Sequence, residues 1–270
     1  MSKDKMVVEP GEREIEGEDL DPDGFTGWFR DVLVSWGPAL LAVLLLRSMV
    51  AEPFRIPSGS MVPTLAIGDH ILVTKYSYGL RYPLTRIPVT EIQVPDRGDV
   101  VVFVFPKSDT GTVREWLDLP IPGVTTTLDY VKRVVGLPGE TVEVRDNVVY
   151  IDGEAQTKTM TEQVDFVDVR CRPIPSNAYE EDLEGTSHAL LNSRYGMHLR
   201  DYPPTVVPPG HVFVMGDNRD HSQDSRVWGF VPLRNLKGKA RFIWFSYDQC
   251  EPGLWMLGRI RTERFFEAIR

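Results

Sequence analysis

The sequence has few of the residues that build metal, redox and nucleic-acid sites. It contains two cysteines, Cys171 and Cys250, and five histidines among 270 residues. Neither cysteine belongs to a CxxC pair or to another spacing that zinc ligands use, so the sequence predicts no metal and no cofactor. Lysine and arginine are not clustered, which argues against nucleic acid as a partner.

The two cysteines leave two interpretations open. Cys171 and Cys250 can form a disulfide if the domain that carries them lies outside the cytoplasm. Two unrelated thiols are an equal alternative. The glycines give no phosphate site either, because Gly136–Gly139 lacks the GxxxxGK[ST] pattern and no helix is expected after it; this run predicts a turn.

Negative charge is concentrated at the N-terminus. The net charge is −9, and Met1–Gly24 carries nine acidic and three basic residues with few large apolar ones. Such a segment cannot bury enough surface to offset its chain entropy, so it predicts a disordered acidic tail over residues 1–24. The rest of the chain is nearly balanced in charge, and its length suits one large domain or two small ones.

One long uncharged run, Val32–Leu46, follows the tail. It has about 15 residues, or about 20 if Arg47 extends to the lipid headgroups, and a membrane span needs about 20. A buried core helix and a cleaved signal peptide are the alternatives, but the acidic lead and the Met49–Ala51 sequence are poor signal-peptide features. The run and its aromatic flank predict one N-terminal transmembrane helix within residues 25–51.

After Ala51 the chain has the pattern of short strands punctuated by proline and glycine. The β-branched and aromatic segments are 71–73, 100–105, 130–135, 141–145, 148–151, 211–215 and 240–247, with a tight hairpin turn at Asp146-Asn147. No long amphipathic helix is expected here. The fold class predicted is mainly β, with a barrel-like or sandwich-like domain over residues 52–154 and 210–248.

Three segments do not fit this pattern. Residues 107–128 are polar and contain proline, which predicts an exposed loop. Residues 155–209 are weakly periodic and predict an inserted cap or subdomain. Residues 249–270 form a C-terminal segment without a clear assignment.

Two hydroxyls and one lysine carry the candidate chemistry. Ser58 and Ser60 lie two positions apart in Ser58–Leu65, and a strand would place both on one side. Such a Ser/Gly/Pro stretch is usually only a turn. Lys132 lies inside an apolar strand, where it either extends to solvent or becomes buried. Burial lowers the pKa of a lysine, and a neutral amine can serve as the general base that a serine nucleophile needs.

Four stretches in one order resemble the bacterial type I signal peptidases. They are a serine box, Ser58–Leu65; a GDxILV box, Gly68–Val73; a KRVVGLPGE box, Lys132–Glu140; and a GDNRDxSxDSR box, Gly216–Arg226. The resemblance runs from about Glu52 to Pro232. Each box is moderately specific, and the four together are highly specific. The resemblance implies a catalytic β domain of signal-peptidase type behind a membrane anchor.

The resemblance also implies a role for each matching residue. Ser60 would be the nucleophile and Lys132 the general base, a Ser-Lys dyad. The Ser58 hydroxyl and the Ser60 backbone N–H would form the oxyanion hole, and Ser222 would orient the lysine amine. Asp224 would be a structural partner of Arg226 and of Arg133. The shallow pockets for an added substrate strand would be lined by Phe54, Ile56, Pro57 and Val131.

Two other groups compete for the role of base. Lys75 is closer in sequence to Ser60, but the resemblance places the base in the Lys-Arg box. His221 stands where the family commonly has asparagine, and it permits a rival triad of Ser60, His221 and either Asp220 or Asp217. Asp217 and Arg219 are expected to be scaffold, and His188 a surface or packing residue.

The function that the resemblance implies is a membrane-anchored serine endopeptidase that cleaves signal peptides from exported preproteins. Its partners would be preprotein signal peptides and the lipid bilayer. It would cross the bacterial plasma membrane once, with the catalytic domain outside the cytoplasm. The alternatives are an inactive peptide-binding module of the same fold and a self-cleaving repressor, which would need a helical DNA-binding domain at the N-terminus.

Overall fold

A computed structural model describes residues 22–106, 128–195, 201–253 and 258–270. The chain divides into two compact units, Met1–Val43 and Leu44–Arg270. Most of the predicted acidic tail and the predicted 107–128 loop lie outside the described residues.

The first long element is α1, Pro22–Met49, with Pro38 inside it. Thr26–Met49 is apolar enough to cross a membrane, with a mean hydropathy of 1.8 over its best window, of which 6% is buried. Low burial distinguishes this helix from the core helix of a soluble protein. At about 1.5 Å per residue these 24 residues exceed a hydrocarbon core of about 30 Å. The predicted candidate span is therefore present and longer than the apolar run alone suggested.

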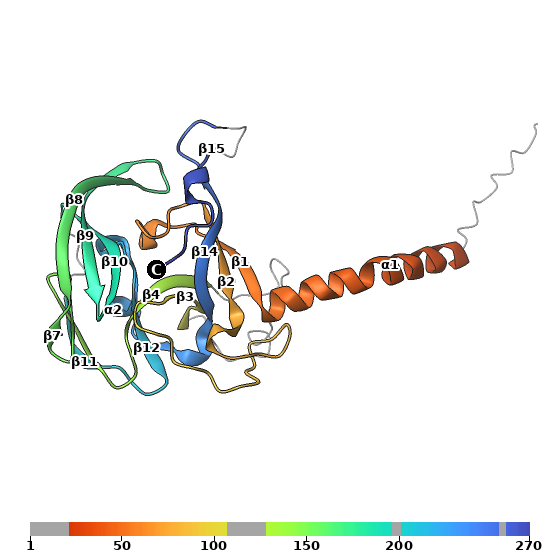
Figure 1. Cartoon of the computed structure of the whole chain (residues 1–270), viewed down its shortest axis with the longest axis horizontal. Helices are drawn as coiled ribbons and strands as arrows, with labels where there is room; N and C mark the ends of the chain where they lie inside the picture. The colour runs from red at the N-terminus through yellow and green to blue at the C-terminus, as the bar shows by residue number, and fades with distance from the viewer. Residues whose placement is uncertain (1–21, 107–127, 196–200, 254–257) are drawn as a thin grey trace, which may run out of the picture. The chain divides into compact units, whose positions relative to one another are not determined.

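The second unit is built on one large antiparallel sheet (Figure 1). Its strand order is β1-β2-β14-β3-β4-β12-β13, with β15 paired to β14. The strands are β1 Ala51–Arg55, β2 Asp69–Thr74, β3 Val100–Val104, β4 Asp129–Gly136, β12 His211–Met215, β13 Val231–Pro232, β14 Leu236–Asp248 and β15 Arg259–Ile260. The mainly β fold and the strands predicted in this part of the chain are confirmed.

One apolar core cluster of the sheet joins residues at its β1 end to residues of β14, β3 and β4. Ile56, just after β1, packs in one cluster with Val102 of β3 and Ile243 of β14, and Val131 of β4 packs against the same cluster. The cluster also contains Met61 and Leu65, which anchor the serine segment, Ser58–Leu65, to the core. This packing brings β1 and β4 to the two sides of one groove.

Two smaller sheets complete the second unit. One has the order β11-β5-β6-β7 and the other β10-β9-β8. Their strands are β5 Thr141–Arg145, β6 Val148–Ile151, β7 Glu154–Ala155, β8 Thr157–Val167, β9 Pro173–Leu183, β10 Thr186–Ser193 and β11 Tyr202–Val206. The predicted hairpin turn at Asp146-Asn147 is confirmed, since both residues have positive φ as a two-residue hairpin requires.

Helical turns fill the connections between strands. They are η1 Gly59–Met61, η2 Lys75–Tyr78, η5 Arg219–His221, α2 Ser225–Trp228, η6 Leu233–Asn235 and η8 Thr262–Arg264. Ser58 caps η1 in an extended conformation, so the pair Ser58 and Ser60 lies in a turn and not in a strand. The strand geometry considered for this pair is wrong.

Cys171 and Cys250 form a disulfide across 79 residues. It ties the β8–β9 connection to the end of β14. The alternative of two unrelated thiols is therefore wrong.

Candidate active site

Ser60 is held in place by hydrogen bonds to its own carbonyl and to the carbonyl of the preceding residue, Gly59. It sits partly exposed in η1, between buried Ile56 and buried Met61. The backbone N–H of Asn218 donates to the Ser60 carbonyl at 3.1 Å, and the Asn218 side chain donates to the Gly59 carbonyl at 3.0 Å. The loop that follows β12 thus fixes the position of the serine.

Lys132 reaches Ser60 from the middle of β4. Its side chain is buried, with 2% of the residue exposed, and its Nζ lies 2.6 Å from Ser60 Oγ and 2.9 Å from the Val131 carbonyl. Burial lowers the pKa of Lys132 to about 8, although the nearby carboxylates of Asp224 and Asp217 act to raise it. Lys132 is therefore not a lysine that extends to solvent, and a useful fraction of it is neutral near pH 8.

Gly216 lets the segments that carry Ser60 and Ser222 pack closely against it. A Cβ at this position would overlap both the Ser60 carbonyl oxygen and Ser222 Oγ. Ser222 is 1% exposed, and its Oγ has no hydrogen-bond partner among the residues that the structure describes. Its predicted contact with the lysine amine is thus not made as a hydrogen bond here. Ser58 Oγ lies 3.5 Å from Ser60 Oγ, so it can reach an oxygen bound beside the serine.

Two buried ion pairs surround the serine and lysine. Arg226 contacts Asp224 through Nε at 2.8 Å and through Nη2 at 2.8 Å, and the Gly216 N–H donates to the same carboxylate at 3.0 Å. This is the predicted Asp224–Arg226 contact. Arg133, however, does not pair with Asp224. Its guanidinium donates two hydrogen bonds to Asp217, at 2.9 and 2.7 Å.

The Asp217 carboxylate also accepts a hydrogen bond from Thr64 Oγ1 at 2.5 Å. Burial would raise the pKa of Asp217, but the Arg133 guanidinium outweighs burial and holds the pKa below its usual range. Because Thr64 belongs to the serine segment and Arg133 to β4, Asp217 ties together the two elements that carry Ser60 and Lys132.

A further layer connects this network to the three-stranded sheet. Arg219 pairs with buried Glu181 of β9, through Nη1 at 3.0 Å, and His188 of β10 lies 3.5 Å from Glu181 and 3.9 Å from Asp217. Burial, with the charge of Arg133, lowers the pKa of His188 to about 4. Glu181 and Thr64 were not singled out from sequence, because their partners are distant along the chain and no local pattern marks them.

The competing bases do not reach Ser60. Lys75 is buried in an ion pair with Glu52 at 3.1 Å. His221 packs edge-on against Phe166, and its Nε2 has no hydrogen-bond partner among the described residues. Asp220 accepts from Asn147 and from the Ser193 N–H instead. The lysine and histidine alternatives therefore lack the contacts that a base needs.

A groove of about 480 Å³ leads to Ser60. It is lined by the end of β1 and the residues after it, by Leu128–Lys132, and by His221 and Gln223. The four predicted pocket residues, Phe54, Ile56, Pro57 and Val131, all line it. Within the described part of the chain, β1 pairs only with β2, which leaves its other edge free.

The described residues contain no cluster of three or more His, Cys, Asp or Glu side chains that could hold a metal ion. What the geometry offers is a serine hydroxyl in contact with a buried, easily neutralised amine, at the end of a groove. A β-rich domain with this pair belongs to the class of serine hydrolases.

Comparison with known proteins identifies the family. The model of the family described as signal peptidase, peptidase S26, matches residues 29–245. Signal peptidase I of Haemophilus influenzae is 37% identical over 266 residues, covering 89% of this chain and 76% of that protein. Signal peptidase I of Pseudomonas aeruginosa is 38% identical over 232 residues, covering 80% of this chain and 74% of that protein. A crystal structure of a signal peptidase I from Enterococcus faecalis is 28% identical, covers 54% of this chain and 95% of that chain, and has a TM-score of 0.29.

The chain belongs to the signal peptidase family. It is a serine endopeptidase with an N-terminal apolar helix suited to membrane anchoring. These matches are to peptidases, and they give no support to the alternative of an inactive binding module.

Proposed function

We propose that this chain removes signal peptides from exported preproteins with Ser60 as nucleophile and Lys132 as general base. The observation that carries the proposal is the 2.6 Å contact between Lys132 Nζ and Ser60 Oγ, with the lysine almost fully buried. A buried amine whose pKa is about 8 gives up its proton near neutral pH, which an exposed lysine does not.

The reaction begins when the neutral Lys132 amine accepts the proton of the Ser60 hydroxyl. Ser60 Oγ attacks the scissile carbonyl, and the carbonyl oxygen becomes an oxyanion. The Ser58 hydroxyl and the Ser60 backbone N–H donate hydrogen bonds to this oxyanion. The Lys132 ammonium then gives its proton to the leaving amine, which departs with the mature chain and leaves an acyl-enzyme.

A water molecule then hydrolyses the acyl-enzyme, with Lys132 again as the base. The neutral Lys132 amine takes a proton from a water molecule that attacks the ester carbonyl, and the proton returns to Ser60 Oγ when the ester bond breaks. Ser222 is proposed to orient the amine through these steps. Asp224 with Arg226, and Arg133 with Asp217, are proposed to hold the two segments at a fixed distance.

The substrate is proposed to bind as an extended strand in the 480 Å³ groove. Alternate side chains of such a strand point the same way, so the first and third residues before the cut would face Ile56, Phe54 and Val131. These walls leave room for small side chains only.

The membrane is proposed to be the bacterial plasma membrane, crossed once by α1, with the tail in the cytoplasm and the second unit outside it. The Cys171–Cys250 disulfide supports this topology, because disulfides persist in oxidising compartments and not in the cytosol. Substrates arrive with their own apolar segment in the bilayer, so an anchored enzyme meets them there.

The test is cleavage of a purified preprotein by the full chain in detergent micelles. Ser60→Ala and Lys132→Ala should each lower kcat by at least about a thousandfold, and the double variant should be hardly slower than either single one, because the two residues act as a unit. Ser187→Ala, an exposed serine on β10, is the matched control and should cleave normally. A Lys132→Ala protein with near-normal kcat would refute the dyad.

A further inference from the structure

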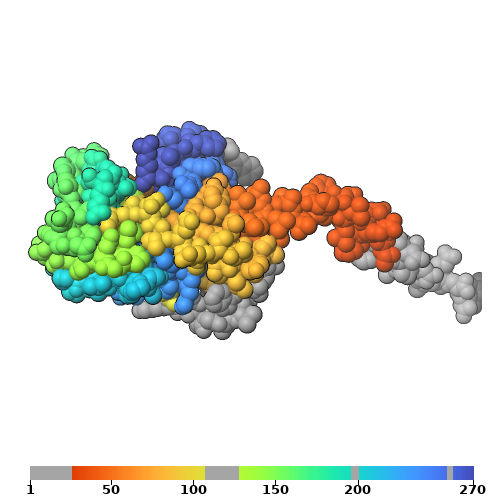
Figure 2. Space-filling view, turned by 60° about the horizontal axis from the view of Figure 1, so that its bottom comes forward, coloured from red at the N-terminus to blue at the C-terminus, as the bar shows by residue number. Residues whose placement is uncertain are grey.

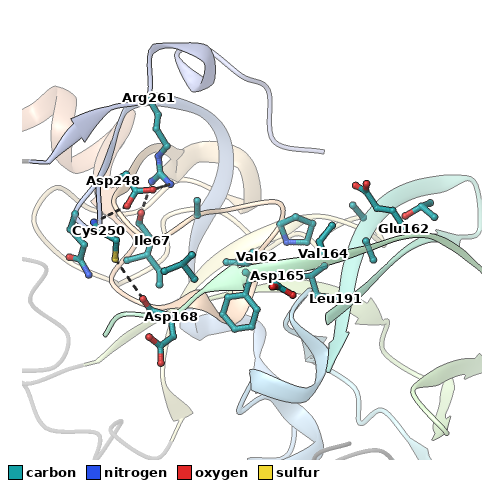
Figure 3. Close-up of a pocket in the computed structure, with 18 residues that line it drawn as sticks. Val62, Ile67, Glu162, Val164, Asp165, Asp168, Leu191, Asp248, Cys250 and Arg261 are labelled. Atoms are coloured by element: carbon teal, nitrogen blue, oxygen red, sulfur yellow. Dashed lines mark hydrogen bonds and ion pairs between the residues drawn. The ribbon is translucent and has the colours of Figure 1, made fainter. Parts of the chain in front are cut away.

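A second cavity, of about 470 Å³, lies beyond Ser60 along the serine segment. Its walls come from residues 62–67, which follow Ser60, from all three strands of the sheet β10-β9-β8, and from the end of β14 with Arg261. Figure 3 shows Arg261, Asp248 and Cys250 at one end of it and Glu162, Val164 and Leu191 at the other. In Figure 2 the green and cyan residues, which include β8–β10, lie next to the blue C-terminal part of the chain. The volume is within the usual range for binding sites in proteins.

The floor of this cavity is apolar and its rim is polar. Phe166, Leu191 and Ala178 form a buried cluster with Val62 and Val164 packed against it, and all five residues line the cavity. The rim carries acidic side chains, among them Glu162 and Asp248, and the guanidinium of Arg261. A floor of this kind suits the aliphatic or aromatic side chain of a peptide, while a polar rim suits its backbone.

The wall formed by β8 has a free strand edge. In the three-stranded sheet β8 pairs only with β9, within the described part of the chain. The four consecutive β8 residues 164–167 all line the cavity, although successive side chains of a strand point to opposite faces. The cavity therefore follows the edge of β8. An exposed strand edge offers unpaired backbone N–H and C=O groups to an extended peptide.

The cavity touches the residue next to the nucleophile. A Cβ built on Gly59 would lie 3.4 Å from the Phe166 ring and 3.6 Å from Ile67, both of them walls of the cavity. The Phe166 ring also packs on His221, with ring centroids 5.3 Å apart, and His221 lines the groove that leads to Ser60. The groove and the cavity are thus neighbours, separated by this pair of rings.

Direction follows from the position of the cut. In the proposed function, residues before the cut occupy the groove that Phe54–Ser58 line, so residues after the cut would leave Ser60 on the other side. On that side the serine segment continues as Val62 and Pro63, which line the cavity. Because Gly59, next to Ser60, already lies against the cavity walls, and an extended chain advances about 3.3 Å per residue, the first few residues after the cut are within reach of the cavity.

We propose that this cavity binds the first residues of the mature chain, extended along the β8 edge, with an apolar side chain from the second to fourth position in the floor. The inference rests on the proposed function, since it needs a preprotein cut at Ser60. In this proposal β8 and β10 contribute to substrate selection. The substrate passes from the groove to the cavity beside the Phe166–His221 pair.

Cross-linking locates the mature segment directly. The full chain with Ser60→Ala is incubated in micelles with a preprotein that carries a photo-reactive side chain three residues after the cut. The expected products join this position to residues 162–168 or to Leu191. Cross-links confined to the groove or to other surfaces would overturn the proposal. A probe placed three residues before the cut is the control, and it should label Leu128–Lys132 or the end of β1.

Kinetics test whether the cavity is used in turnover. Two substrates share the residues before the cut; one continues with five residues, the third of them Leu, and the other ends in a small amide. Ala189→Trp fills the cavity from an exposed lining position, and the ratio of kcat/KM for long over short substrate should fall about tenfold. Ala155→Trp, at an exposed position of β7 that does not line the cavity, should keep the parent ratio. An unchanged ratio for Ala189→Trp would refute this inference alone, whereas a parent chain that cleaves neither substrate would refute the proposed function.

Discussion

At the scale of single residues, the proposed chemistry depends on the protonation state of Lys132. Its ammonium is desolvated by β4 and its neighbours, so its pKa falls to about 8 from an ordinary value of 10.5. The charged form cannot accept the proton of Ser60. Turnover should therefore follow the fraction of lysine that is neutral, which is about a tenth at pH 7 and a half at pH 8.

We predict that kcat/KM rises with pH along a single titration with a midpoint near 8 and then levels off. The pKa of Lys132 is lower in the folded chain than in the unfolded chain. Between about pH 8 and 10.5 the unfolded chain holds a proton there that the folded chain does not. The contribution of Lys132 to stability therefore increases with pH over this window. The profile is measured with a peptide that has no titrating group near the cut. A flat profile while the protein stays folded would count against a lysine base.

Gly216 gives a second prediction. In Gly216→Ala the new methyl group would overlap the Ser60 carbonyl and Ser222 Oγ, so the serine segment or its neighbouring loop must move. A displacement of about 1 Å in a reacting group costs about a hundredfold in rate, so kcat should fall by about that factor. The measurement is kcat beside the thermal unfolding midpoint. Gly27→Ala in α1, where a methyl group meets no atom within 4 Å, is the control with normal kcat. Normal turnover in Gly216→Ala would contradict the close packing inferred here.

At the scale of elements, the groove is formed where the free edge of β1 and the strand β4 meet over one core. An extended substrate in this groove has alternate side chains on opposite sides. The walls formed by Phe54, Ile56 and Val131 belong to the side that the first and third residues before the cut would face.

We therefore predict different tolerance at adjacent substrate positions. Phenylalanine in place of alanine at the third position before the cut should stop cleavage of a model preprotein, because the ring would push the scissile carbonyl away from Ser58 and Ser60. The same replacement at the second position should be tolerated, since that side chain points away from the enzyme. The rates of the two variants are compared by gel assay at equal preprotein concentration. Equal tolerance would exclude docking of the substrate as a strand.

The strands of the main sheet could be predicted because the types of their side chains are typical of buried strands. β3, and β12 after its first residue, are buried on both faces and consist mainly of β-branched and aromatic residues. β8 was not predicted, because most of its side chains are exposed and polar, and its alternation is correspondingly weak. The sequence indicated Ser60 and Lys132 through their boxes and the chemistry of a buried amine.

The pairing of Arg133 with Asp217 could not be predicted in the same way. The two residues are 84 positions apart, and either of two neighbouring carboxylates, Asp217 or Asp224, suits an arginine equally well in sequence. Only the fold decides, because the Gly216 N–H and Arg226 bind Asp224, while Asp217 accepts from Thr64 and from Arg133 of β4. The second cavity likewise has no local signature, since its walls come from segments that are far apart in the sequence.

At the scale of the whole molecule, the chain combines an apolar helix with a β unit that contains a disulfide. Together, the helix and the disulfide restrict how the chain can be placed in a membrane. The helix suits one crossing of a bilayer, and the disulfide suits an oxidising compartment. In the proposed topology, a single crossing would put the acidic residues of Met1–Gly24 and the Cys171–Cys250 pair on opposite sides of the membrane.

This topology gives the last prediction. In spheroplasts that express the full chain, a membrane-impermeant maleimide should label Thr159→Cys, which is exposed on β8, without lysis. Ser2→Cys should be labelled only after lysis, because the tail would lie in the cytoplasm. Cys171 and Cys250 should not react unless a reductant is added first, since the disulfide leaves no free thiol. Each variant carries one added thiol, and the parent chain corrects for background. Labelling of Ser2→Cys in intact spheroplasts, or free thiols at Cys171 and Cys250, would place the catalytic unit on the cytoplasmic side and refute the proposed location.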